Sequence, residues 1–182
     1  MRISTERRDL IEACKRGDSR AMEKIYAMYY KPMFNTAYRI INDFHFAEDI
    51  MQEAFLKAFA NLHRFEGRST FGAWLKRIVV NESLNWLKKY KRFDNQLQEE
   101  QIPEQTDREE DETEFFHRTE PGKLLQALGR LKDNYRTILS LYYLEGYDYE
   151  EIMEIMGLSY QHARTMLSRA KNKLKKLLEN GK

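Results

Sequence analysis

The sequence predicts an all-α protein built from two small helical domains with a flexible acidic linker between them. Apolar residues recur every three or four positions in one segment after another, as they do on the buried face of an α-helix. No segment alternates polar and apolar residues for long enough to predict a sheet. The net charge of +2 is a sum of unlike parts, +6 over residues 1–96, −8 over residues 97–120 and +4 over residues 121–182. We therefore place the domains at 1–96 and 121–182 and the linker at 97–120.

Helix ends and helix starts can be placed along the first domain. The Gly17-Asp18 pair predicts that one helix stops and that the next is capped, and Pro32 is expected to open a further helix. Apolar residues form one continuous stripe over residues 46–62. After a loop at residues 65–69, the last helix of the domain is expected from about Phe71 to Tyr90.

The linker holds ten acidic and two basic residues within 24 positions, with Pro103 inside it and Pro121 directly after it. Dense like charge with few aliphatic residues cannot offset the entropy cost of ordering the chain by burial. We expect a flexible segment. A solvated acidic helix is the alternative, because Glu-rich segments also form helices.

Four helices are expected in the second domain. Apolar residues mark the first over residues 124–131 and the second over residues 135–146. Asp148 and Glu151 have the spacing of a capping box, with Asp in place of the usual Ser or Thr. They open a short third helix.

The last two helices of this domain form a helix-turn-helix pattern. Gly157 ends the short helix, and Ser159 caps a longer one after a three-residue turn. The long helix carries no acidic residue before Glu179 but six basic ones, Arg164, Arg169, Lys171, Lys173, Lys175 and Lys176. Such charge suits contact with DNA phosphates, and the first residues of the helix would face base edges in the major groove. A basic terminal helix that complements its own dipole is the alternative.

Basic, aromatic and amide side chains gather on the loop and last helix of the first domain. The basic residues are Arg64, Arg68, Lys76, Arg77, Lys88, Lys89, Lys91 and Arg92, the rings are Phe65, Phe71 and Trp74, and the amides are Asn81 and Asn85. This combination suits single-stranded nucleic acid, whose bases stack on rings and bond to short polar groups. Trp74 lies in the apolar stripe and is expected in the core, and both amides could be ordinary exposed residues.

An acidic cluster lies near the start of the helix that begins at about Phe46. Its members are Glu48, Asp49, Gln52 and Glu53. Carboxylates near the N-terminus of a helix, as Glu48 and Asp49 would be, favour the helix dipole, and the same cluster could form a docking face for a basic partner. The two interpretations are compatible.

Catalytic and metal-binding patterns find little support in the sequence. There is no glycine-rich phosphate loop, and the one Glu-x-x-His spacing, Glu114 with His117, lies in the acidic linker. The single cysteine, Cys14, cannot form an intramolecular disulfide. The polar start and the lack of a run of about 18 apolar residues predict neither a signal peptide nor a membrane span. We expect a cytoplasmic protein that is not an enzyme and binds no cofactor or metal.

Four strings of the sequence are similar to one known family. They are AEDIMQEAFLKAF at residues 47–59, FEGRSTFGAWLKRIVVNESLNWLKK at residues 65–89, LQALGRLKDNYRTILSLYYLEGYDYEEIMEIMGLS at residues 125–159 and LSRAKNKLKK at residues 167–176. In this order, with a variable linker among them, they resemble the bacterial RNA polymerase sigma factors of the extracytoplasmic-function (ECF) group of the sigma-70 family. The resemblance implies an initiation factor that directs core polymerase to promoters.

The resemblance also implies a role for each cluster. Residues 1–96 correspond to sigma region 2, and residues 121–182 correspond to region 4. Glu48, Asp49, Gln52 and Glu53 would dock on the clamp helices of the largest polymerase subunit. An unpaired base of the −10 element would be captured by Phe65, Gly67, Arg68, Ser69, Asn81, Asn85 and Lys88. The −35 element would be read by Tyr160, Gln161, His162, Arg164, Thr165, Ser168, Arg169 and Lys171.

The implied partners are core RNA polymerase, through its clamp helices and flap region, promoter DNA in double- and single-stranded form, and an anti-sigma factor. Met166 stands where relatives carry a basic residue, so we expect it to pack against a neighbouring helix instead of contacting phosphate. The preferred DNA sequence is expected to differ accordingly. The alternative function is that of a two-domain helix-turn-helix regulator that binds duplex DNA without core polymerase.

Overall fold

The computed structural model describes residues 2–90 and 119–179. Over those residues it contains helices and no strand, which confirms the all-α prediction. The chain divides into two compact units, Met1–Trp86 and Leu87–Lys182. The predicted linker, residues 97–120, lies outside the described residues except for its last two. Its boundaries, and the choice between a flexible segment and an acidic helix, therefore stay predictions.

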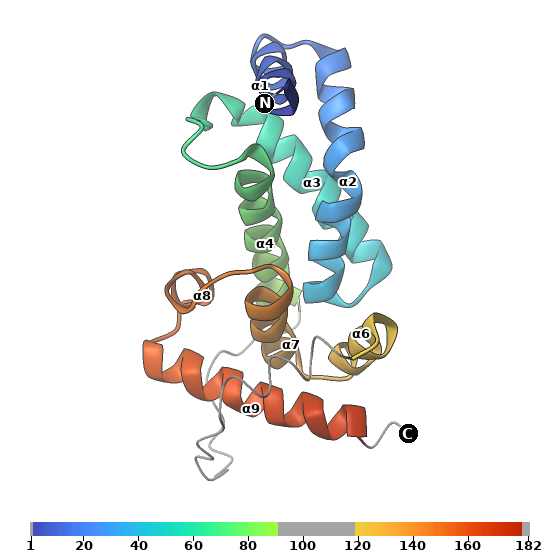
Figure 1. Ribbon diagram of the computed structural model, residues 1–182, viewed down its shortest axis with the longest axis vertical. Helices are drawn as coiled ribbons and strands as arrows, with labels where there is room; N and C mark the ends of the chain where they lie inside the picture. Colours follow the sequence, from blue (N-terminus) through green and yellow to red (C-terminus); the bar gives the residue numbers. More distant parts are fainter. Residues whose placement is uncertain (1, 91–118, 180–182) are drawn as a thin grey trace. The chain divides into compact units, whose positions relative to one another are not determined.

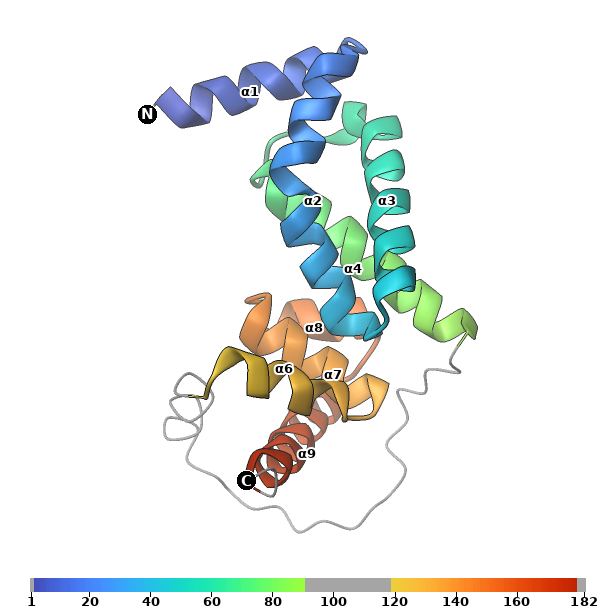
Figure 2. The ribbon, with the colours of Figure 1, turned by 90° about the vertical axis from the view of Figure 1, so that its right-hand side faces the viewer.

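The described part of unit 1 is a helical bundle. Its elements are α1 (Arg2–Lys15), α2 (Ser19–Ile41), α3 (Phe44–Ala60), the short 3₁₀ turn η1 (Leu62–Arg64) and α4 (Phe71–Tyr90), whose last turn passes the boundary between the units. Helices α2 and α3 lie side by side, α4 crosses them obliquely, and α1 lies across one end of the bundle (Figures 1 and 2). Their apolar faces meet in a core that includes Ile25, Ile40, Ala54, Phe55, Leu75 and Val79.

Side-chain caps fix where these helices begin. Asp18 Oδ1 accepts hydrogen bonds from the backbone N–H groups of Arg20 and Ala21 at 2.9 and 3.2 Å, which confirms the predicted boundary after Gly17. Such a cap satisfies N–H groups that have no partner within the helix. The prediction of a helix from Phe71 to Tyr90 is also confirmed.

Pro32 lies inside α2, so the prediction that it opens a helix is wrong. A proline within a helix removes one hydrogen bond and ordinarily costs about 3 kcal/mol. Here Pro32 and Met28, whose carbonyl loses its partner, are both exposed, so that water can reach this side of the helix. The carbonyl of Pro32 still accepts a bond from Thr36 Oγ1 at 3.2 Å. The helix therefore continues through the proline to Ile41.

The described part of unit 2 consists of α6 (Pro121–Gly129), α7 (Asp133–Leu139), the π-helical turn η2 (Ser140–Leu144), α8 (Tyr149–Met156) and α9 (Tyr160–Glu179). Because η2 continues α7, these elements match the four predicted helices. α9 is the longest of them and packs against α6, α7 and α8. The buried side chains between them include Ile138, Leu139, Ile152, Met156 and Leu167.

Two neighbouring polar side chains on α7 are buried but differ in their hydrogen bonding. Arg136 donates to the carbonyl of Leu131 at 3.2 Å and forms an ion pair with Asp133. Thr137 is 0% exposed, and its Oγ1 has no hydrogen-bond partner among the described residues. A buried hydroxyl without a partner destabilises the folded state, because it has lost its hydration without a replacement.

Candidate nucleic-acid interface

The helix-turn-helix predicted from the sequence is present in unit 2. Asp148 Oδ1 accepts from Glu151 N at 2.8 Å and Glu151 Oε2 accepts from Asp148 N at 3.1 Å, which is the predicted capping box of α8. α8 ends at Gly157, whose φ of 69° is left-handed and favours glycine. Ser159 Oγ accepts from His162 N at 3.3 Å and caps α9. The turn between the two helices therefore has the predicted three residues.

The side chains of α9 divide between a buried face and the remainder of the helix. The buried face consists of Ala163, Met166, Leu167, Ala170 and Leu174. Four predicted −35 contacts are exposed, namely Tyr160, Gln161, His162 and Arg164. The other four are half-buried, namely Thr165, Ser168, Arg169 and Lys171. None of the eight belongs to the buried face, so all of them lie on the part of the helix that a DNA groove could reach.

Met166 is 0% exposed and belongs to the face of α9 that packs in the core of unit 2. The expectation that it packs against a neighbouring helix is confirmed. A thioether fills such space without needing a hydrogen bond, whereas a charged side chain would have to be desolvated there. Position 166 therefore provides no phosphate contact in this chain.

In unit 1, the predicted −10 loop is fixed at both ends and exposed in the middle. The ring of Phe65 is 9% exposed, and its centroid lies 5.7 Å from that of Phe71 and 5.3 Å from that of Trp74. At the other end, Thr70 Oγ1 accepts from Ala73 N at 3.2 Å and caps α4. Between them, Gly67 has a φ of +75° and no atom within 4 Å of the position of a Cβ. Phe65 thus anchors the loop, and the residues that it presents are those that follow.

The exposed part of this loop is polar. Glu66, Gly67, Arg68 and Ser69 are all exposed, and Arg68 forms an ion pair with Glu66 at 2.7 Å. A pair so exposed contributes little to stability and can be exchanged for a phosphate at low cost. Arg68 is therefore available to a nucleic acid.

Helix α4 extends this surface away from the loop. Asn81, Asn85 and Lys88 are exposed and share one face of the helix at spacings of four and three. The same face continues back to Ile78 and Trp74, both half-buried, and Trp74 contacts Phe65 and Phe71 as a core position would. At a rise of about 1.5 Å per residue, Asn81 lies about 15 Å along the helix from its start. The loop and the amides thus form one surface, which is long enough for several nucleotides.

The acidic cluster on α3 has an exposed part and a half-buried part. Asp49, Gln52 and Glu53 are exposed, and Leu56 continues the same face with 71% of its surface exposed. Leu56 was not predicted to belong to this face, although its spacing of three and seven residues from Glu53 and Asp49 could have shown it. A single exposed leucine is common on protein surfaces, and here it adds an apolar side chain to the acidic face.

Lys57 links this cluster to α4. Its Nζ lies 2.5 Å from Glu82 Oε2 and 3.0 Å from Glu53 Oε1. The hydrogen bond to Glu82 is the main reason why the pKa of Lys57 is raised, with Glu53 adding to it against the opposing effect of burial. One of the four predicted docking residues, Glu53, is therefore already paired within the chain.

Glu48, the half-buried member of the cluster, lines a groove of about 470 Å³ between α2 and α3. The other lining residues are mostly aromatic, and they include Tyr26, Tyr30, Phe34, Phe44 and Met51. Tyr30 and Phe44 are 46% and 57% exposed. No sequence motif signals this groove, because its walls come from two helices that meet only in the fold.

The described residues contain no group of three or more His, Cys, Asp and Glu side chains that could hold a metal ion. Glu114 and His117 lie outside the described residues. Among the helices described, none is both long and apolar enough to cross a bilayer.

Two family models match the chain, sigma-70 region 2 at residues 25–93 and sigma-70, region 4 at residues 122–174. RNA polymerase sigma factor YlaC of Bacillus subtilis is 30% identical over 157 residues, which cover 86% of this chain and 91% of YlaC. ECF RNA polymerase sigma factor SigM of the same species is 29% identical and covers 88% of this chain and 96% of SigM.

Solved structures support the fold. CnrH, in complex with the cytosolic domain of CnrY, has a TM-score of 0.58 at 23% identity and covers 96% of this chain and 98% of that chain. Sigma factor RpoE of Bartonella quintana, in complex with the anti-sigma factor NepR, has a TM-score of 0.58 at 24% identity. The match covers 86% of this chain and 96% of the RpoE chain.

Proposed function

The chain belongs to the extracytoplasmic-function group of RNA polymerase sigma factors, and we propose how its surfaces divide the work of such an initiation factor. Unit 2 reads the −35 element, the loop and α4 of unit 1 capture an unpaired −10 base, and α3 docks on core polymerase. The observation that carries this division is that two separate surfaces with nucleic-acid chemistry, α9 and the loop with α4, occur on one chain beside an acidic face.

At the −35 element, α9 enters the major groove with its first two turns. Gln161 is suited to adenine and Arg164 to guanine, since each can form two hydrogen bonds to that base. The lysines farther along the helix, Lys173, Lys175 and Lys176, are exposed and would contact phosphates. Each phosphate contact steepens the dependence of log K on log salt by about 0.9 on duplex DNA.

At the −10 element, the surface formed by the loop and α4 favours the melted strand. An unstacked base would be held at the loop, with Asn81 and Asn85 bonding to polar edges and Arg68 and Lys88 contacting phosphates. These groups stabilise only the open strand and so offset an unstacking cost of a few kcal/mol, on the order known for flipped bases. Melting is then driven by binding energy, and the chain itself performs no chemistry.

Core polymerase would dock on the exposed face of α3. Asp49, Gln52 and Glu53 offer acceptors to a basic surface, and Leu56 offers an apolar contact. Glu48 adds less, because it is half-buried at the groove. A factor that works with core polymerase on promoter DNA acts in the cytoplasm. The complex of RpoE with the anti-sigma factor NepR supports an anti-sigma partner for this chain as well.

The experiment that tests this function separates it from a regulator that binds duplex DNA alone. The purified chain is mixed with core polymerase and passed over a size-exclusion column, and the chain alone is tested for sequence-specific shifts of duplex promoter fragments. A sigma factor is expected to elute with core polymerase and to need it for promoter binding. A specific shift by the chain alone, with no stable complex, would favour the regulator.

A further inference from the structure

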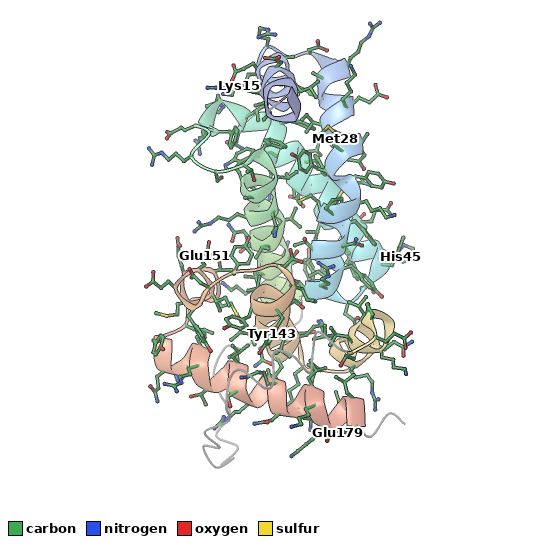
Figure 3. All side chains as sticks on the ribbon, viewed as in Figure 1. Lys15, Met28, His45, Tyr143, Glu151 and Glu179 are labelled. Atoms are coloured by element: carbon green, nitrogen blue, oxygen red, sulfur yellow. The ribbon has the colours of Figure 1, made fainter. Side chains whose placement is uncertain are left out.

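A hydrogen bond joins the end of α1 to the start of the capture loop, which we define as residues 65–70. Lys15 Nζ donates to the backbone carbonyl of Phe65 at 3.3 Å, across 50 residues of sequence. Lys15 is the last residue of α1, and it lies at the end of unit 1 opposite to His45 (Figure 3).

The ammonium of Lys15 is held on two sides. Glu12, one turn earlier on α1, accepts from Lys15 Nζ at 3.1 Å. The side chain of Lys15 is 28% exposed and that of Glu12 is 51% exposed, so the lysine side chain is the more sheltered of the two. Pairs spaced by three residues stabilise each other on a helix surface. Glu12 therefore favours a conformation of Lys15 that also reaches the loop.

The carbonyl that Lys15 binds sets the direction of the loop. Phe65 has φ −75° and ψ 102°, and its ring is buried against Phe71 and Trp74. With the ring fixed, the next backbone bond that can rotate is the Cα–C bond of Phe65, described by ψ. Rotation about it turns the carbonyl and the following residues together. A bond from Lys15 to that carbonyl resists the rotation. It thereby fixes the path on which Glu66, Gly67 and Arg68 leave the core.

We infer that Lys15 is a positioning residue for the capture loop, and that α1 thus takes part in promoter melting without contacting DNA. The inference rests on the proposed function of the loop. It adds Lys15 to the residues on which base capture depends, although Lys15 belongs neither to the loop nor to α4 and no nucleic-acid motif surrounds it in the sequence.

The test measures binding of a single strand by the assembled holoenzyme. The probe is a fluorescent oligonucleotide copied from the non-template strand of a promoter whose start site has been mapped with this factor. Lys15→Met is expected to weaken binding about three- to tenfold, the effect of losing one solvent-accessible hydrogen bond. Lys15→Arg should restore affinity to within about twofold, because a guanidinium can also donate to the carbonyl.

Two controls accompany these variants. Lys31→Met removes an exposed lysine of the same unit that has no ion-pair partner among the described residues, and it should leave binding unchanged. The salt dependence separates positioning from direct contact. A lysine that binds phosphate would lower the slope of log K against log salt by about 0.7 on a single strand when it is removed, whereas loss of a positioning residue leaves the slope unchanged.

Three results would overturn the inference: unchanged capture in Lys15→Met, a slope reduced by about 0.7, or a loss that Lys15→Arg does not repair while both variants melt at a lower temperature. The last would show a role in folding only. The proposed function is tested separately by Asn81→Ala. If that variant also binds the strand normally, the loop and α4 are not the capture surface, and the failure lies with the proposed function.

Discussion

Lys57 on α3 bonds to Glu82 on α4, with 2.5 Å between Nζ and Oε2, and its ammonium also contacts Glu53 at 3.0 Å. The pair ties two helices of unit 1 together. It also means that Glu53, one of the predicted docking residues, is already paired with a lysine of the same chain.

Because of this pair, the free energy of unfolding is expected to depend on pH in the alkaline range. Because the pKa of Lys57 is raised above its ordinary 10.5 in the folded chain, the stabilising effect is fully present below that value and is lost as the pH rises through the higher folded pKa. Lys57→Met should lower the free energy of unfolding at pH 9 by at most about 1 kcal/mol, since the lysine is partly exposed. The difference from wild type should shrink as the pH rises beyond 10.5.

Urea unfolding of the two proteins at several pH values between 9 and 12 measures this effect, with Lys31→Met as the matched control. A difference between wild type and Lys57→Met that grows with pH would contradict the assignment of the raised pKa to these ion pairs.

The two carboxylates of the docking face should contribute unequally. Glu53 is already paired with Lys57, whereas Asp49 is exposed and has no ion-pair partner among the described residues. Asp49→Asn is therefore expected to weaken binding to core polymerase about tenfold, and Glu53→Gln only about threefold. Titration of labelled core polymerase at low salt gives both values, and a larger loss in Glu53→Gln would show that this assignment is reversed.

Gly67 should tolerate asparagine better than alanine. Its φ of +75° is left-handed, and no atom blocks a Cβ, so the penalty comes from the backbone alone, about 1 kcal/mol or more for alanine. Asparagine adopts this conformation more readily, as Asn42 does at the end of α2 with a φ of 55°. Gly67→Ala should reduce single-strand capture by about five- to tenfold and Gly67→Asn by less. Capture as tight as wild type by both variants would mean that the loop conformation does not matter.

Removing the unpaired hydroxyl of Thr137 should stabilise unit 2. Thr137→Val keeps the shape of the side chain and is expected to raise the free energy of unfolding by about 1 kcal/mol. Thr36 is the matched control, because it is also buried but donates to the carbonyl of Pro32. Thr36→Val should lower stability by a similar amount. Calorimetry of both variants measures this, and a destabilised Thr137→Val would point to a hydrogen bond that forms in solution.

Helix caps and helix bounds could be predicted from the sequence wherever they depend on residues close together in the chain. The caps at Asp18, Asp148 and Ser159 are local hydrogen bonds, and the bounds of α4 follow from local spacing. Pro32 was misplaced because its effect depends on which side of α2 faces water, and that is decided by packing against other helices.

The parts of the site that escaped prediction are contacts between distant segments. The bond from Lys15 to Phe65 spans 50 residues, and the groove at Glu48 has walls from two helices. Phe65 was predicted as part of the capture site, and the structure buries it as the anchor of the loop. No local pattern distinguishes an anchoring ring from a stacking one.

Run-off transcription with core polymerase on fragments of genomic DNA, with the start sites mapped, is the most direct test of whether the chain directs core polymerase to promoters. Adding the chain is expected to produce discrete start sites that core polymerase alone does not use. Asn81→Ala should lower transcript yield at these sites about tenfold while holoenzyme still forms, and Arg164→Ala should impair those that depend on the −35 element. The proposed role as an initiation factor would be contradicted if the chain produced no new start site on any fragment. The proposed capture surface would be contradicted if Asn81→Ala transcribed as wild type does.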